Sequence, residues 1–150
     1  MFSSAISENP KSYLELKGHK VIDKGTFSTD SVDYPQFGHD VGKAITTGEQ
    51  NTAVGNQALR NNSTANSNVA VGDSAAIITT TGAANVAIGS ETMKCNTEGC
   101  RNTAVGHSAL KSSACASFNV AIGYLAMFDN TTGYQNVAVG YGSLENNTTG

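Results

Sequence analysis

Hydrophobic and polar residues follow one another in a pattern that recurs every 17 residues over about two thirds of the chain. The phrase N-x-A-[VI]-G begins six times, at Asn51, Asn68, Asn85, Asn102, Asn119 and Asn136, and no insertion or deletion interrupts it. A fixed period of this kind indicates an array of equivalent structural units.

Positions two to four of each unit predict a short strand. Position two is Thr or Val, position three is always Ala and position four is Val or Ile, a composition suited to a strand. The second unit shows the repeat-defining residues, Asn68, Ala70, Val71 and Gly72. Because position five is Gly in all six units, we expect a positive φ there or the close approach of another backbone.

The remainder of the unit predicts a second buried row and a turn. Position nine is apolar throughout, at Leu59, Ala76, Met93, Leu110, Met127 and Leu144. Positions 12 to 15 read as a turn, as in Asn130-Thr131-Thr132-Gly133. Gly, Asn, Thr and Val are poor helix formers, which argues against a helical-hairpin repeat. The pattern predicts an all-β fold, a parallel β-solenoid or β-roll with two short strands per 17-residue coil.

The array predicts how the chain is divided. Residues 38–50 look like a degenerate coil, and six coils fill residues 51–150. Residues 1–37 hold both prolines and few apolar residues, so we expect a docking or capping segment, with a hairpin over residues 13–23. The last coil would leave strand edges open, so we expect a partner or a further segment to cover it.

The repeats resemble those of viral and phage tail-fibre or appendage proteins. The resemblance rests on residues 51–59 (NTAVGNQAL) and 130–133 (NTTG) and covers residues 38–150. More distantly, the repeats are similar to the head repeats of trimeric autotransporter adhesins, which form left-handed parallel β-rolls but have shorter coils. The resemblance implies a left-handed trimeric roll that serves as a structural fibre segment on a virion or an extracellular surface. Its implied partners are two further copies, other fibre or particle proteins at the ends, and a glycan or host receptor.

The repeat gives a separate reason to expect an oligomer. Positions two and four face opposite to the Ala at position three, so both faces of the strand are apolar. We expect the Ala-lined face to allow close approach of a neighbouring chain. The alternative is a monomeric solenoid whose own chain covers the Ala face.

Composition and charge exclude several classes of function. The chain has 9 basic and 12 acidic residues, and the basic residues are scattered, so no nucleic-acid partner is expected. No segment reads as a signal peptide or a membrane span. His107-Ser108 occupies tolerant positions that hold Asn56-Gln57 in another coil, which predicts a surface pair. We therefore expect no catalytic residue, cofactor or metal, and a protein that is not an enzyme; a glycan-cleaving solenoid would need clustered carboxylates.

The cysteines and threonines leave alternatives open. Cys100 and Cys115 fall near each other across a turn, so they either form a disulfide or, with Cys95, fill turn positions as free thiols. Threonine runs such as Thr79-Thr80-Thr81 suggest the alternative of an ice-binding or other monomeric β-solenoid binding protein.

Aromatic residues are confined to one end of the array. Residues 38–117 contain none, whereas the last two coils hold the predicted partner surface, formed by Tyr124, Phe128, Tyr134 and Tyr141. Amphipathic rings suit contact with a protein or a glycan. The alternative is that these rings brace neighbouring coils.

Overall fold

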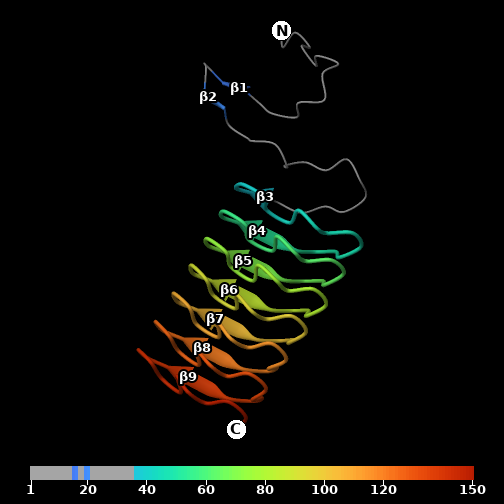
Figure 1. Cartoon of the computed structure of the whole chain (residues 1–150). Helices are drawn as coiled ribbons and strands as arrows, with labels where there is room; N and C mark the ends of the chain where they lie inside the picture. Colours follow the sequence, from blue (N-terminus) through green and yellow to red (C-terminus); the bar gives the residue numbers. More distant parts are fainter. Residues whose placement is uncertain (1–14, 17–18, 21–35) are drawn as a thin grey trace.

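The computed structural model describes residues 15–16, 19–20 and 36–150 (Figure 1). Near the N-terminus, β1 (Glu15–Leu16) pairs antiparallel with β2 (His19–Lys20), in agreement with the predicted hairpin over these four residues. The other residues of that hairpin lie outside the described part of the chain. None of the described residues belongs to a helix that is long and apolar enough to cross a membrane.

The predicted parallel solenoid is confirmed. One seven-stranded sheet runs in the order β3-β4-β5-β6-β7-β8-β9, and each coil lies on the next (Figure 1). Its strands are β3 (Gln36–Phe37), β4 (Thr52–Val54), β5 (Val69–Val71), β6 (Val86–Ile88), β7 (Thr103–Val105), β8 (Val120–Ile122) and β9 (Val137–Val139). From β4 onward every neighbouring pair is parallel and in register, for example Ala53 with Ala70.

The first paired strand begins before the predicted start of the array. Gln36 pairs with Ala53, and Phe37 pairs with Val54. Position nine of this first coil is Gly42, with φ of 55°, where the later coils have an apolar side chain. The division into an N-terminal segment and an array stays a prediction.

Each coil of β4 to β9 contains one strand, so the prediction of two strands per coil was wrong. Position nine, which was expected to lie in the second strand, has a left-handed backbone, with φ of 49° at Leu59 and Met93. A β-strand requires negative φ, so the chain turns at this position. Hydrogen bonds between successive coils hold the segment instead, as from Leu59 N to Ala75 O at 3.0 Å.

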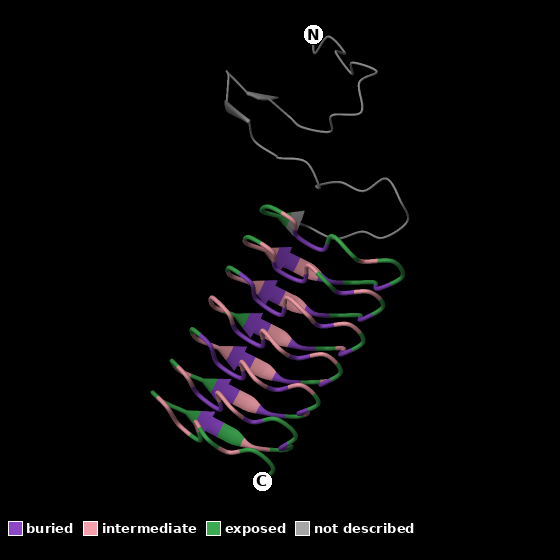
Figure 2. Cartoon of the chain, in the orientation of Figure 1, coloured by how far each residue is buried: buried purple, intermediate pink, exposed green. Residues whose placement is uncertain are grey.

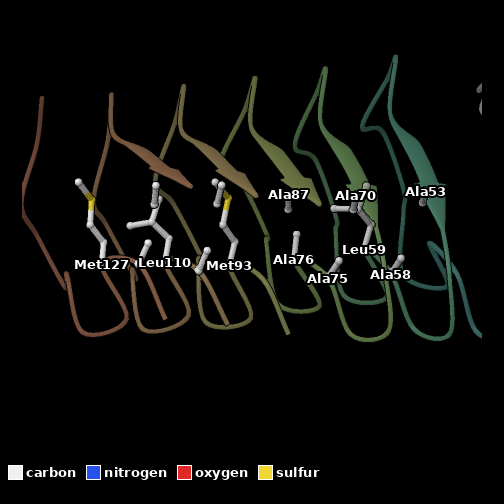
Figure 3. Packing of buried hydrophobic residues seen from close by; sticks show 14 of the residues in the cluster. Ala53, Ala58, Leu59, Ala70, Ala75, Ala76, Ala87, Met93, Leu110 and Met127 are labelled. Carbon is white, nitrogen blue, oxygen red and sulfur yellow. The ribbon is translucent and has the colours of Figure 1, made fainter. Parts of the chain in front are cut away.

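The core lies inside a single chain and is built largely of alanine. The Ala residues at position three, such as Ala53, Ala70 and Ala87, point inward toward position nine (Figure 3). The same buried cluster includes the Ala residues at position eight, Ala58, Ala75, Ala109 and Ala126. Ala70, Met93 and Leu110 are fully buried. The prediction that the Ala face meets a neighbouring chain was therefore wrong, because the coil covers these residues itself (Figure 2).

The opposite side of the strands carries the β-branched residues of positions two and four. They are half-buried or exposed, and they are most exposed in the last strand, β9, where Val137 is 70% exposed and Val139 is 66% exposed. This arrangement follows from the alternation of side chains along a strand once Ala faces inward.

The Gly at position five adopts the predicted conformation. Its φ lies between 124° and 139° in the six coils from Gly55 to Gly140. At Gly72, an added Cβ would overlap the carbonyl oxygen of Gly89 in the next coil. Both the positive φ and the close approach therefore require Gly here.

The Asn at position one forms a buried ladder along the rod. Asn85 donates from Nδ2 to the carbonyl of Gly99 at 2.7 Å, and its Oδ1 accepts the backbone N–H of Asn102 at 3.0 Å. Asn68 repeats these contacts with Gly82 at 2.9 Å and with Asn85 at 2.9 Å. Each side chain thus joins its own turn to the following coil, which explains why the position is always Asn.

Candidate functional site

A compact charged cluster lies where the coil of β6 meets the coil of β7. Glu91 accepts hydrogen bonds from Lys94 Nζ at 2.6 Å and from Lys111 Nζ at 2.7 Å, one on each carboxylate oxygen. Lys94 and Lys111 both stand at position ten of their coils, which brings them side by side in the stack. The ammonium group of Lys111 also lies 5.4 Å from the centre of the Phe128 ring.

This cluster fixes the charge of its members. Hydrogen bonds from Lys111 and Lys94 lower the pKa of Glu91 to about 2. The hydrogen bond to Glu91 in turn raises the pKa of Lys94, and the negative charge of Asp73 contributes to the same shift. Glu91 is therefore a stable anion and a weak proton acceptor at neutral pH.

A row of side chains at position six runs along the stacked coils, next to the charged cluster of Glu91. His107 and Tyr124 stack with ring centroids 5.4 Å apart, and Tyr124 stacks on Tyr141 at 5.2 Å. At the other end of the row, Asn56 Nδ2 donates to Asp73 Oδ1 at 2.7 Å. In-register coils place each of these residues directly over the next.

Between the two halves of this row stands Ser90. Its hydroxyl makes no hydrogen bond within the described part of the chain, and its backbone carbonyl accepts the N–H of Ser108 at 3.0 Å. The ring of His107 therefore has Tyr124 on one face and a short polar residue at the next place in the row. Glu91 follows Ser90 directly in the chain, so the row and the charged cluster adjoin.

The predicted aromatic surface is divided by the structure. Tyr124 and Tyr141 belong to the stacked row and are 46% and 80% exposed, whereas Tyr134 is exposed elsewhere on the coil. Phe128 is half-buried under Lys111. Their role as a partner surface stays a prediction. Of the pair predicted to lie on the surface, His107 is exposed, but Ser108 is buried.

A second charged cluster surrounds Asp40 in the first coil. Its carboxylate lies 3.3 Å from Lys43 Nζ, 3.6 Å from Arg60 Nε and 3.9 Å from His39 Nδ1. Partial burial acts to raise the pKa of Asp40, but the hydrogen bond from Lys43 and the neighbouring charges lower it below its ordinary value. Asp40, like Glu91, is committed to ion pairing.

The structure also shows the state of the cysteines and the contacts of the threonines. Cys95, Cys100 and Cys115 are free thiols in this structure. Within the residues that the structure describes, no three His, Cys, Asp or Glu side chains gather in a way that could hold a metal ion. Threonine hydroxyls at position 13 donate to carbonyls of the next coil, as from Thr80 to Thr97 at 3.2 Å.

Sequence reasoning missed both the charged cluster and the stacked row. The signal was available in the period: residues at the same position of successive coils are neighbours, so His107, Tyr124 and Tyr141 had to adjoin, as did Lys94 and Lys111. The column of His107 was interpreted only as tolerant, which concealed the stacking.

Comparison with known proteins gives one family. The model of a family described as Ribose/Galactose Isomerase matches residues 4–105, about two thirds of the chain. The match ends at Val105, the last residue of β7, while the same coil continues through β8 and β9. No solved structure matches the chain. The family match comes from sequence, and the coil geometry does not add to it.

This match corrects several predictions made from the repeats. The identification with viral or phage fibre proteins and adhesin heads is contradicted, and with it the structural fibre function and the place on a virion or extracellular surface. The partners implied by a fibre, namely a homotrimer, particle proteins and a host receptor, are contradicted as well. The ice-binding alternative is not favoured either, and the expectation of a protein without enzyme activity is wrong on the same finding.

Proposed function

Because the chain belongs to the ribose/galactose isomerase family, we propose that it interconverts an aldose sugar and the corresponding ketose. The family match over residues 4–105 is the observation that carries this proposal. Such a reaction removes a proton from the carbon next to the carbonyl and returns a proton to the neighbouring carbon. It requires a base within reach of the carbon that loses its proton, and an acid near the carbonyl oxygen and the neighbouring hydroxyl oxygen.

The described coils limit which side chains can transfer protons. Glu91 and Asp40 are held as anions by cationic partners, which makes both of them weak bases. His107 has no ion pair among the described residues, and imidazole is the side chain most often used for proton transfer near neutral pH. His107 is therefore an acid–base candidate, and Lys111 is the cation nearest to it in sequence that could attract an anionic substrate.

The test is an isomerase assay on the full chain. D-ribose, D-galactose and the phosphate esters of both are incubated with the protein in heavy water and followed by proton NMR. We expect ketose to form and deuterium to enter at C1, the former carbonyl carbon, which receives a proton in the reaction. His107→Ala, purified in the same way, controls for a contaminating host isomerase and should lose at least ten-fold in rate. Ketose formation no faster than in a sample without protein, for all four sugars, would refute the proposal.

A further inference from the structure

The position-six row leaves one face of an exposed ring uncovered. Three successive coils place rings in the row, at His107, Tyr124 and Tyr141, with centroids 5.4 Å and 5.2 Å apart. The fourth place holds Ser90, which has no ring to continue the stack. His107 is exposed, and within the described coils its only ring partner is Tyr124. The stack of rings is thus interrupted beside His107, and we call this place, at Ser90, the gap.

Polar groups with unused hydrogen-bonding capacity border the same gap. On its far side, Asp73 Oδ1 accepts from Asn56 at 2.7 Å and Oδ2 accepts from Ser74 Oγ at 3.1 Å. These bonds orient the carboxylate, yet each oxygen keeps a lone pair for another donor. At the floor of the gap, the Ser90 hydroxyl has no partner among the described residues and can donate or accept.

The dimensions fit one saturated ring. Asp73 and His107 are two coils apart, which corresponds to about 9.6 Å at the usual spacing of neighbouring strands. A ring stacked about 5 Å from the imidazole would take the place of the missing row member. The opposite face of that ring would then point toward the Asp73 carboxylate, and its edge would point toward the serine hydroxyl.

We infer that the gap at Ser90 binds a sugar ring, with its C–H face on His107 and its hydroxyls on Asp73 and Ser90. This inference rests on the proposed function for the choice of ligand. A sugar matches the gap because it combines an apolar face with a rim of hydroxyl donors, and a carboxylate is a strong acceptor for such donors. A flat aromatic ligand would also stack on His107, but it would leave the oriented carboxylate of Asp73 without a donor.

Filling the gap provides the decisive variant. Ser90→Tyr should add a fourth ring to the row, and position six already accepts Tyr at 124 and 141, so we expect the coil to fold. The matched control is Thr81→Tyr, which adds the same ring at an exposed turn of the preceding coil. The hydroxyl of Thr81 makes no hydrogen bond within the described residues.

Binding is measured separately from turnover, by saturation-transfer NMR on the full chain with D-ribose and D-galactose as probes. We expect transfer to the sugar C–H protons in the native protein and in Thr81→Tyr, and a loss of at least five-fold in Ser90→Tyr. His107→Ala should lose a similar amount and serves as the second variant if Ser90→Tyr does not fold, as judged by circular dichroism.

The outcomes separate this inference from the proposed function. Unchanged sugar binding in folded Ser90→Tyr or in His107→Ala overturns the site, and so does the absence of transfer in the native protein. Ketose formation that persists in Ser90→Tyr overturns the site and leaves the isomerase proposal standing. Sugar binding that is lost in Ser90→Tyr, without ketose formation by the native protein, supports the site and overturns the isomerase proposal.

Discussion

Single residues with left-handed backbones set the shape of each coil. Positions 7, 9 and 17 repeat φ values near 50° to 60° at residues other than Gly, such as Gln57, Leu59 and Ser67. Each such residue carries a strain of about 1 to 2 kcal/mol. Contacts that recur between coils must offset this strain. The requirement is strictest at position five, where the structure tolerates no side chain and the residue is always Gly.

The Gly at position five allows the dihedral and steric requirements to be separated. Gly72→Ala should destabilise the protein by more than about 3 kcal/mol, because φ of 139° is unsuited to Ala and the Cβ would overlap Gly89. Gly140→Ala meets nothing within 4 Å and has φ of 124°, so its cost should stay at the dihedral strain, about 1 to 3 kcal/mol. Urea unfolding followed by circular dichroism measures both. Equal losses of stability in the two variants would show that the overlap with the next coil does not contribute to the destabilisation.

The ion pairs of Glu91 should make part of the stability depend on pH. The pKa of Glu91 is lowered from 4.5 to about 2 in the folded protein, so its contribution is fully present above pH 4.5 and is lost as the pH falls toward 2. Glu91→Gln should therefore cost about 1 kcal/mol at pH 7 and clearly less at pH 2.5. Urea unfolding at pH 7 and at pH 2.5 tests this.

The control for that experiment is Glu98→Gln. Glu98 is exposed and has no ion pair within the described residues, so its replacement should change stability little at either pH. A Glu91→Gln effect of the same size at both pH values would contradict the ion-pair explanation.

At the scale of the element, the Asn ladder holds each turn to the next coil. Asn85→Ala removes the donor to Gly99 and the acceptor for Asn102, which leaves buried backbone groups without partners. We expect a loss of about 3 kcal/mol in urea unfolding. Asn61→Ala is the matched control, because Asn61 is exposed and its side chain makes no hydrogen bond among the described residues. A loss as small as that of the control would mean that water replaces the ladder.

The strand could be predicted from sequence, but the rest of the coil could not. Three residues of Val-Ala-Val type followed by an unvarying Gly specify a strand and its end, and both were found. The apolar residue at position nine predicts burial equally well in a strand or in a turn. Leu and Met are rare at φ near 50°, so the sequence alone favoured a strand at position nine, whereas the structure has a turn there.

The sequence pattern also could not predict that the side chain of Ala70 points into the core. Positions three and four are apolar in every coil and position two is Val or Thr, so alternation could not say which face meets the core. The structure places the smallest side chain inside because position nine and the Ala at position eight already occupy the space. The stacked row at His107 depended on the same register and could have been predicted once the period was known.

At the scale of the whole molecule, the repeats predicted the fold and not the function. A coil architecture constrains how a chain packs, whereas activity depends on particular side chains placed on it. The fibre prediction carried a function over from the repeats, and the family match overturned it. The residues that distinguish one coil from another, such as Ser90 and Glu91, are therefore the ones to test.

Register should be the strictest global requirement of the rod. Removing residues 68–84 deletes one complete coil, so we expect a folded sheet with one strand fewer and moderately lower stability. Removing residues 69–84 deletes one residue fewer than a complete coil. Every later position then shifts by one relative to its neighbour, which exchanges the inward and outward faces of the strands. Circular dichroism and hydrogen exchange would distinguish the two. Equal folding of both variants would contradict a fixed register.

The uniform stacking of coils has a genetic consequence. Each coil contacts only its neighbours and repeats with a constant offset of 17 residues, as in the bond between Asn51 and Asn68. A gene segment that encodes one coil can therefore be duplicated or lost by recombination between repeats without disturbing the reading frame or the packing. Length can change in whole coils during descent, while new side chains accumulate in a single copy.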